Sequence, residues 1–234
     1  GEKGFMKVVS GSFELPRLGG RPALDGASTP FKILDTYIKH FPVEYHAQTA
    51  VEAALALRAK LIEQEGPETI HTLSDVEIGS YAVAIEIIGR DPEKWRPATR
   101  ETADHSFPYC VAAALMDGRL ALPSFNDKRL ADPALRKLMR HIRVIPLPDF
   151  DGVYPGTMPT RITATTAKGV TYSAHVDLPL GHPARPLSDR QIEEKFRRLA
   201  SRRLGGTRLN RLIEFVWNLE QVKDIGTLMP LLKV

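Results

Sequence analysis

Apolar residues along the chain recur with two different spacings, one typical of helices and one typical of strands. A strand is predicted over residues 31–38, where β-branched and aromatic residues mix. A helix is predicted over residues 44–63, which contain no Gly or Pro and repeat apolar residues on roughly one helical face. A second strand is expected over residues 69–78, followed by a short helix over residues 82–88. This order favours helices packed on one face of a sheet.

The middle of the chain carries signals for helix ends. A helix over residues 106–116 should end at Gly118. A further helix over residues 132–141 should begin with Asp132 as its N-cap and Pro133 in its first turn. The alternation of apolar and polar residues that follows suits an antiparallel sheet with one exposed face. Its strands are expected over residues 141–145, 160–166 and 170–176, the last two joined as a hairpin.

The C-terminal part of the chain is predicted to be helical throughout. Ser188 is a suitable N-cap, and Gln191 three residues later completes the pattern of a capping box. A Gly-Gly pair at residues 205–206 separates two helices. The sequence therefore predicts an α+β fold: a mixed sheet with helices packed on one face, plus a C-terminal helical segment.

These patterns divide the chain into three parts. Residues 1–29 are rich in Gly and Pro and form a connecting segment, residues 30–186 form the α+β domain, and residues 187–234 form the helical segment. The apolar residues of the helical segment need a further surface to pack against, for example in an oligomer.

The composition indicates a soluble globular protein. The chain has 234 residues, 43% of them hydrophobic, and a net charge of +4, which argues against disorder. No apolar run approaches the ~20 residues that span a bilayer, and the N-terminus lacks a signal-peptide pattern. We therefore expect a cytoplasmic or organelle-matrix protein without a membrane partner, although the start of the sequence looks like the middle of a longer chain.

Cysteine and histidine usage limits the cofactors. The single cysteine, Cys110, excludes an internal disulfide and cannot by itself supply the thiolates of an iron–sulfur cluster. It lies in an apolar helical run, where a buried structural thiol is favoured over a nucleophile. The seven histidines show no metal-ligand spacing. We expect neither a metal nor another cofactor.

Basic residues gather over positions 195–211 and raise the alternative of nucleic-acid binding. However, Ile192, Phe196 and Leu199 recur at helical spacing among them, which favours an amphipathic helix with a solvated basic face. We therefore expect no nucleic-acid partner.

Reactive side chains crowd residues 39–50, where the predicted strand gives way to the predicted helix. Lys39, Glu44 and His46 lie within this short stretch. A helix N-terminus supplies unpaired N–H groups and partial positive charge, so such a junction suits an anionic substrate. A structural interpretation, in which these residues cap and turn the chain, remains equally open at this point.

Three motifs together resemble a known family. They are residues 39–50 (KHFPVEYHAQTA), 101–118 (ETADHSFPYCVAAALMDG) and 181–189 (GHPARPLSD). Their sequences and order are similar to the MmgE/PrpD family, and within it most similar to 2-methylcitrate dehydratases. The resemblance spans nearly the whole chain but covers only the C-terminal half of a family member.

The resemblance implies a cofactor-independent lyase that converts 2-methylcitrate to 2-methylaconitate and water in the methylcitrate cycle of propionate catabolism. The family also contains cis-aconitate decarboxylases and iminodisuccinate epimerases, which remain alternatives. The N-terminal helical half would have to come in cis or in trans, and a homodimer is expected. Without catalysis of its own, the chain could instead be an association module or a subunit of a split enzyme.

The resemblance also points to catalytic candidates. Lys39 is the first choice for binding a substrate carboxylate, because its ammonium is a compact cation at the predicted strand end. Tyr109 would donate a hydrogen bond or relay a proton, although a core tyrosine explains it equally well. His105 and His46 are candidate acid/base groups.

Further candidates for substrate binding lie beside these residues. Glu44 would face the substrate or cap the helix, and Ser106 would line the cleft or cap the next helix. Gln48 is a weaker candidate, because a buried amide explains it well. His40 and His71 have no support beyond their residue type and are not selected.

Overall fold

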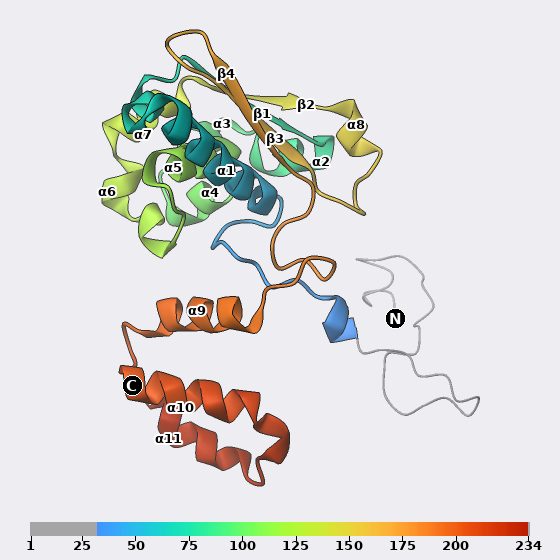
Figure 1. Ribbon diagram of the computed structural model, residues 1–234, viewed down its shortest axis with the longest axis vertical. Helices are drawn as coiled ribbons and strands as arrows, with labels where there is room; N and C mark the ends of the chain where they lie inside the picture. Colours follow the sequence, from blue (N-terminus) through green and yellow to red (C-terminus); the bar gives the residue numbers. More distant parts are fainter. Residues whose placement is uncertain (1–31, 234) are drawn as a thin grey trace, which may run out of the picture. The chain divides into compact units, whose positions relative to one another are not determined.

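The computed structural model describes residues 32–233 (Figure 1). Contacts divide the chain into Gly1–Tyr37 and Ile38–Val234, and every element from α1 onward lies in the second unit. The connecting segment 1–29 and the boundary at residue 30 fall outside the described residues. Within residues 32–233, no helix combines the length and apolar character needed to cross a bilayer.

The strand predicted over residues 31–38 is wrong for its described part. Lys32–Asp35 form a 3-10 turn, η2, and residues 36–39 have no regular structure. An extended run needs a neighbouring strand to pair its backbone groups. Here the backbone N–H of Ile38 donates a single hydrogen bond, to Gly181 O (3.0 Å), far along the same chain. Gly181 has φ +96°, and a Cβ there would lie 1.9 Å from Ile38 O, so this approach requires glycine.

A four-stranded sheet forms the centre of the fold, in the order β2-β1-β3-β4. The strand β1 runs parallel to β2 and antiparallel to β3, and β3 and β4 form the predicted hairpin. The prediction of a mixed sheet in an α+β fold is therefore confirmed. The strands are β1 (Asp75–Ser80), β2 (Ile142–Pro146), β3 (Thr160–Thr165) and β4 (Thr171–Val176).

The predicted strand 69–78 begins later than expected. Residues Pro67–Thr72 form the 3-10 helix η3 instead, with proline in its first turn. Thr69 and Ile70 of this turn are buried, and η3 packs against α1. Burial against a helix has overridden the β propensity of these residues.

Two helices cover one face of the sheet: α1 (Ala47–Glu65) and α5 (Phe107–Asp117) (Figure 1). The core between them contains Val76, Ile78 and Ile162, which are all fully buried. On the opposite face Arg143 forms ion pairs with Asp75 and Glu77 (3.1 and 2.5 Å), across the parallel strand pair. One apolar and one polar face agree with the alternation in the sequence.

Local capping signals place the helices at their predicted positions. Ser106 Oγ accepts a hydrogen bond from Tyr109 N (3.1 Å) at the start of α5, and Gly118 ends that helix in the left-handed region with φ 64°. Asp132 caps α7 (Pro133–Met139) by accepting from Ala134 N (2.8 Å). The remaining elements of this part are α2 (Ala82–Ile88), α3 (Pro92–Trp95), α4 (Arg100–Asp104), η4 (Leu122–Phe125), α6 (Asp127–Leu130) and α8 (Pro148–Asp151).

The C-terminal residues are helical, as predicted. They form α9 (Asp189–Ala200), α10 (Gly206–Trp217), η5 (Leu219–Gln221), η6 (Ile225–Leu228) and α11 (Met229–Leu232). The capping box at the start of α9 is present, with Ser188 N donating to Gln191 Oε1 (2.9 Å). Several large apolar side chains of this part are 45–57% exposed: Leu199, Val216, Trp217, Leu219, Ile225, Met229 and Leu232. The segment thus presents apolar surface that the described residues leave uncovered.

Candidate functional site

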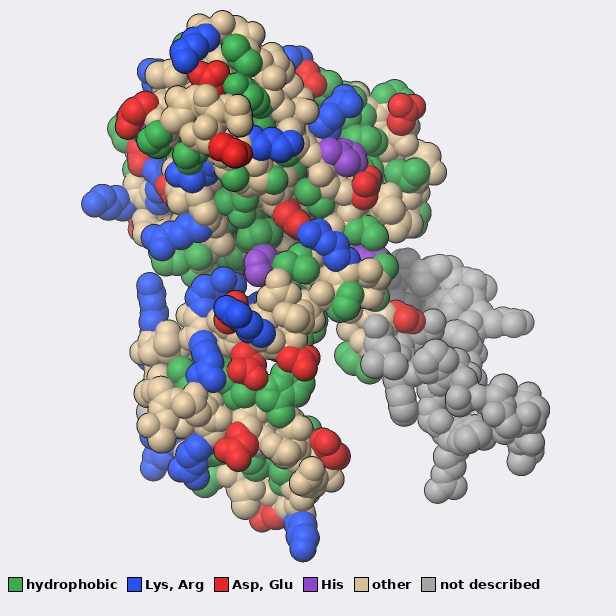
Figure 2. Space-filling view, viewed as in Figure 1, with side chains coloured by type: hydrophobic (Ala, Val, Ile, Leu, Met, Phe, Trp, Pro, Cys, Tyr) green, Lys and Arg blue, Asp and Glu red, His purple; other side chains and the backbone are tan. Residues whose placement is uncertain are grey.

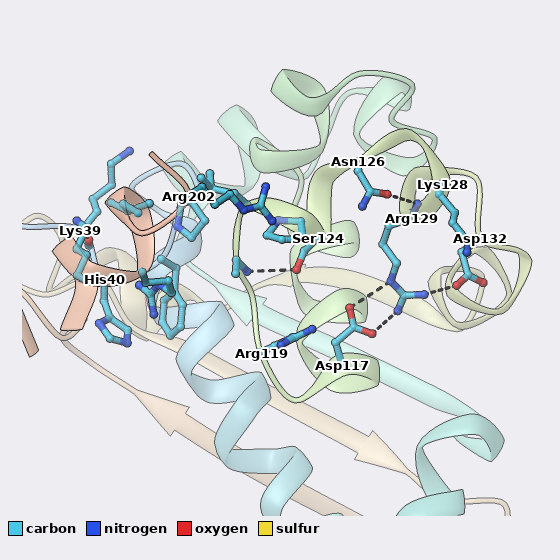
Figure 3. A pocket seen from close by; sticks show the side chains of 18 of the residues that line it. Lys39, His40, Asp117, Arg119, Ser124, Asn126, Lys128, Arg129, Asp132 and Arg202 are labelled. Atoms are coloured by element: carbon cyan, nitrogen blue, oxygen red, sulfur yellow. Dashed lines mark hydrogen bonds and ion pairs between the residues drawn. The ribbon is translucent and has the colours of Figure 1, made fainter. Parts of the chain in front are cut away.

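A cavity of about 1260 Å³ is lined by three segments that lie far apart in the sequence (Figure 3). They are residues 39–42 before α1, residues 117–133 from the end of α5 to the start of α7, and residues 195–202 of α9 and the turn after it. Figure 3 shows Lys39 and His40 on one side, Asp117, Arg129 and Asp132 on the other, and Arg202 between them. The cavity lies entirely within the unit Ile38–Val234.

The cavity lining is strongly basic. Its two carboxylates, Asp117 and Asp132, both form ion pairs with Arg129, whose Nη2 lies 2.7 Å from Asp117 Oδ1. The other cations of the lining form no ion pair with a carboxylate among residues 32–233. They are Lys39, Arg119, Lys128, Lys195, Arg198 and Arg202. Figure 2 shows Lys and Arg side chains gathered around α9. A concave surface with this excess of one charge concentrates polyanions.

Lys39 lies in a turn before α1, not at the end of a strand. Its ammonium donates a hydrogen bond to Val43 O (3.0 Å), and its own carbonyl accepts one from Lys195 Nζ (2.5 Å). The helix begins at Ala47, later than the predicted residue 44. The proposed junction of strand and helix is therefore replaced by an irregular turn that leads into the helix.

Gln48 holds this turn in place from the buried side. Its Oε1 accepts from Phe41 N (3.0 Å), and its Nε2 donates to Phe41 O (2.9 Å) and Val43 O (3.2 Å). The side chain is 2% exposed. All of these partners are backbone atoms, so Gln48 positions the residues that carry Lys39.

His40 lines the cavity, although the sequence offered no reason to select it. Its Nδ1 is buried and has no hydrogen-bond partner in the described part of the chain, and its ring packs edge-on against Phe41 with centroids 4.6 Å apart. Burial lowers the pKa of His40, and the nearby Arg198 lowers it further. Arg198 lies on α9, so only the tertiary structure brings this pair together.

Tyr109 lies behind the cavity lining. It is fully buried, and its hydroxyl donates a hydrogen bond to the carbonyl of Ser124 (2.5 Å), a residue that lines the cavity. Burial raises the pKa of the Tyr109 phenol, which therefore keeps its proton. In this arrangement Tyr109 supports the lining, and its catalytic role stays a prediction.

His46 and Glu44 form a separate cluster at the start of α1. The backbone N–H of His46 donates to Glu44 Oε2 (2.6 Å), and His46 Nδ1 contacts the hydroxyl of Tyr81. Burial lowers the pKa of His46, while Glu44 acts in the opposite direction. Neither residue lines the cavity described above.

His105 and Ser106 lie near the start of α5. The Nδ1 of His105 lies 2.6 Å from Asp104 Oδ1 and 3.0 Å from Glu101 O. Ser106 caps α5 and also donates to the carbonyl of Lys94. Both residues have structural partners, and neither lines the cavity. Of the seven predicted site residues, Lys39 is therefore the one that faces it.

The cationic lining itself was largely missed from the sequence. Arg198 and Arg202 stood in a basic stretch interpreted as the solvated face of a helix, and Arg119 and Lys128 belonged to no motif. Their shared feature is position in the fold, which local spacing does not reveal. Cys110 is fully buried as predicted, and burial raises its thiol pKa. Within the described part of the chain, no group of three or more His, Cys, Asp or Glu residues is arranged to hold a metal ion.

Comparison with known proteins decides the family. The model of the MmgE/PrpD C-terminal domain matches residues 41–221, which is most of the chain. The chain belongs to the MmgE/PrpD family. The matched region includes the sheet, the helices on its face, α9, and the cavity-lining Arg198 and Arg202. Lys39 and His40 lie immediately before it.

Curated relatives of this MmgE/PrpD chain carry two activities in their names. Cis-aconitate decarboxylase of Homo sapiens is 29% identical over 203 residues, which are 85% of this chain and 40% of the relative. The 2-methylcitrate dehydratase of Cupriavidus necator is 32% identical over 173 residues, which are 70% and 34%. The 2-methylcitrate dehydratase of Escherichia coli K12 is 29% identical over 181 residues, which are 74% and 36%. The matches therefore span well under half the length of these relatives.

Proposed function

We propose that this chain supplies the C-terminal, anion-binding part of a cofactor-independent lyase that converts 2-methylcitrate to 2-methylaconitate and water in propionate catabolism. The observation that carries this proposal is the cavity with six cations that form no ion pair with a carboxylate of residues 32–233, in a member of a family whose relatives include 2-methylcitrate dehydratases. A tricarboxylate substrate carries negative charge, which complements this positively charged lining.

The proposed reaction places a specific demand on these cations. A proton leaves a carbon that carries a carboxylate, and negative charge builds on that carboxylate. Hydroxide then leaves the neighbouring carbon. Lys39 would bind a substrate carboxylate, exchanging its bond to Val43 O for one to the ligand. Lys195 would add a second cation from α9. His40, a neutral imidazole in the same lining, would contribute a polar contact.

The complete enzyme would need a second polypeptide segment. The matched relatives are more than twice as long as their aligned region, and the C-terminal helices carry exposed apolar side chains such as Trp217 and Val216. We propose that an N-terminal helical half, joined in cis or bound in trans, packs on these helices, and that the assembly is a homodimer. The alternative is a non-catalytic association module.

A second candidate is the decarboxylation of cis-aconitate. The match to the human decarboxylase covers 85% of this chain, and that to the mouse decarboxylase covers 91%, whereas the match to the Cupriavidus dehydratase covers 70%. Both substrates are tricarboxylates, so the basic cavity serves either. The products distinguish them, because decarboxylation releases CO₂ and dehydration releases water.

The test is an assay of both substrates with the chain alone and with the chain mixed with the N-terminal half. Ultraviolet absorbance follows 2-methylaconitate, and released CO₂ follows decarboxylation. Turnover of 2-methylcitrate in the mixture supports the proposal, and turnover of cis-aconitate selects the second candidate. Tight complex formation without turnover of either substrate would favour the association module.

A further inference from the structure

The loop that connects β4 to α9 is anchored on α1 (Figure 1). This anchored loop comprises residues 178–187 and ends at the N-cap of α9. On α1, Glu52 Oε2 accepts a hydrogen bond from Leu180 N (3.1 Å), and Glu52 Oε1 lies 2.5 Å from Arg185 Nη2. The other end of the guanidinium, Arg185 Nη1, donates to Leu178 O (2.7 Å). One carboxylate and one guanidinium therefore fasten the loop at three points.

The same loop holds the backbone that leads into Lys39. Gly181 N donates to Arg185 O (2.9 Å), and Gly181 O accepts from Ile38 N (3.0 Å). Ile38 directly precedes Lys39, which lines the basic cavity. The anchored loop thus connects one wall of the cavity to α1.

The helix α9 depends on this loop for its position. It contains no fully buried residue. Within residues 32–233, a single hydrogen bond joins α9 to residues 38–187, from Lys195 Nζ to Lys39 O (2.5 Å). Leu187, at the end of the loop, is 7% exposed, and the cap Ser188 follows it directly. A helix with so few buried contacts is easily displaced unless its connection holds it.

Electrostatic repulsion acts to move α9 away from the cavity. Lys195 and Arg198 on α9 line the cavity together with Lys39, and none of the three forms an ion pair with a carboxylate among residues 32–233. Like charges on facing segments repel each other. An attachment that opposes this repulsion is therefore needed, and the anchored loop provides it.

We infer that Glu52 and Arg185 are positioning residues: their ion pair fixes the anchored loop and thereby keeps the cations of α9 in the basic cavity. Neither residue lines the cavity, so both act through the loop. The use of these cations for a tricarboxylate rests on the proposed function, whereas the position of α9 does not.

Titration of His40 by nuclear magnetic resonance distinguishes positioning from a simple charge effect. His40 lines the cavity, and Glu52 raises its pKa, whereas Arg198 and Lys195 lower it. If α9 stayed in place, Glu52→Gln would remove only the raising influence, and the pKa of His40 would fall. We expect this pKa instead to rise toward 6.5, because the two cations of α9 move away. A fall, or no change, would overturn the inference.

The matched control is Glu65→Gln, which removes another paired carboxylate from α1. Glu65 Oε2 lies 2.7 Å from Lys168 Nζ, and neither residue lines the cavity. The control changes the net charge by the same amount as Glu52→Gln and should leave the pKa of His40 unchanged. An equal rise in both variants would show general destabilisation and would refute a specific role of Glu52.

Spin-label distances measure the position of α9 directly, with labels at Gln64→Cys on α1 and Arg190→Cys on α9. Both side chains are exposed, whereas Cys110 is fully buried and stays unlabelled. We expect a narrow distance distribution that Glu52→Gln and Arg185→Gln each broaden. Arg185 is 43% exposed, so its variant keeps the test independent of how well the Glu52 variant folds. An unchanged narrow distribution in either folded variant would contradict the inference.

Calorimetry with tricarballylate, an unreactive tricarboxylate, connects the loop to the proposed function. By charge alone, removing the carboxylate of Glu52 near a basic cavity would strengthen anion binding. We expect Glu52→Gln to weaken binding to the full chain by about fivefold, because the cations of α9 are displaced, and Glu65→Gln to leave it unchanged. Stronger binding by Glu52→Gln would overturn the inference. If the wild-type chain bound no tricarballylate, the proposed function would be refuted, while the His40 titration and the spin-label distances would still decide the position of α9.

Discussion

The ammonium of Lys195 on α9 donates a hydrogen bond to the backbone carbonyl of Lys39, 2.5 Å away and 156 residues earlier in the chain. This contact brings two cations to one side of the basic cavity. Burial lowers the pKa of Lys195, and Arg198 and Lys39 lower it further. Like charges held this close favour a bound anion, because an anion relieves their repulsion.

Substitution of Lys39 should impair turnover and leave the fold intact. In the complete enzyme we expect Lys39→Ala to lower kcat/KM by about a hundredfold, because a charge-assisted bond to the substrate carboxylate is lost. The matched control is Lys60→Ala. Lys60 is also exposed and also donates to a backbone carbonyl, that of Ser173 (2.9 Å), but it does not line the cavity. Equal kinetics for both variants would eliminate the role of Lys39.

Arg198 on α9 and Arg202 just after it should contribute to anion affinity in a salt-dependent way. The double variant Arg198→Gln/Arg202→Gln should weaken binding of tricarballylate, an unreactive tricarboxylate, by about tenfold at low ionic strength and less at high salt. Isothermal titration calorimetry of the chain measures this. Arg161→Gln, an exposed arginine of β3 outside the cavity, is the control. A loss of affinity that does not depend on salt would contradict an electrostatic role.

Acidification should destabilise the chain in part through His40. Its folded-state pKa lies below the ordinary value of 6.5, so the unfolded chain binds more protons as the pH falls past 6.5. The free energy of unfolding must therefore decrease with falling pH in this range. His40→Gln should show a shallower decrease than wild type in urea unfolding measured above and below the ordinary histidine pKa. The same pH dependence in both proteins would count against a depressed pKa.

Loss of the Gln48 amide should destabilise the turn that carries Lys39. Gln48→Ala leaves the N–H and carbonyl of Phe41 without their side-chain partner, and we expect a loss of about 2 kcal/mol in the free energy of unfolding. Gln48→Glu has the same shape but cannot donate to the carbonyls of Phe41 and Val43, so it should also destabilise. Urea unfolding measures both. If Gln48→Glu were as stable as wild type, the donated bonds would not matter.

Helix ends and the fold class followed from the sequence, because their signals are local. Asp132, Ser106 and Ser188 each bond to backbone N–H groups within three residues, and Gly118 ends its helix through its own backbone freedom. These interactions hardly depend on the rest of the chain. The hairpin of β3 and β4 was predictable for the same reason.

The predictions of a strand over residues 31–38 and of an early start for β1 were wrong, because strands depend on partners elsewhere in the chain. A strand exists only if another strand pairs with its backbone, and β-branched residues do not supply that partner. Within the described part of residues 31–38, the chain turns into a 3-10 helix, and Thr69 and Ile70 pack on α1 instead.

The sequence by itself determined the family, the α+β class and most helix boundaries, and it singled out Lys39, whose role stays a prediction. Only the tertiary structure decided which side chains share a cavity. Arg119, Arg198 and His40 come from three segments and meet because the chain folds back on itself, while Tyr109 and Ser106, prominent in a motif, are used to support the core. Motifs record which residues are present, but charge complementarity depends on distances that folding alone establishes.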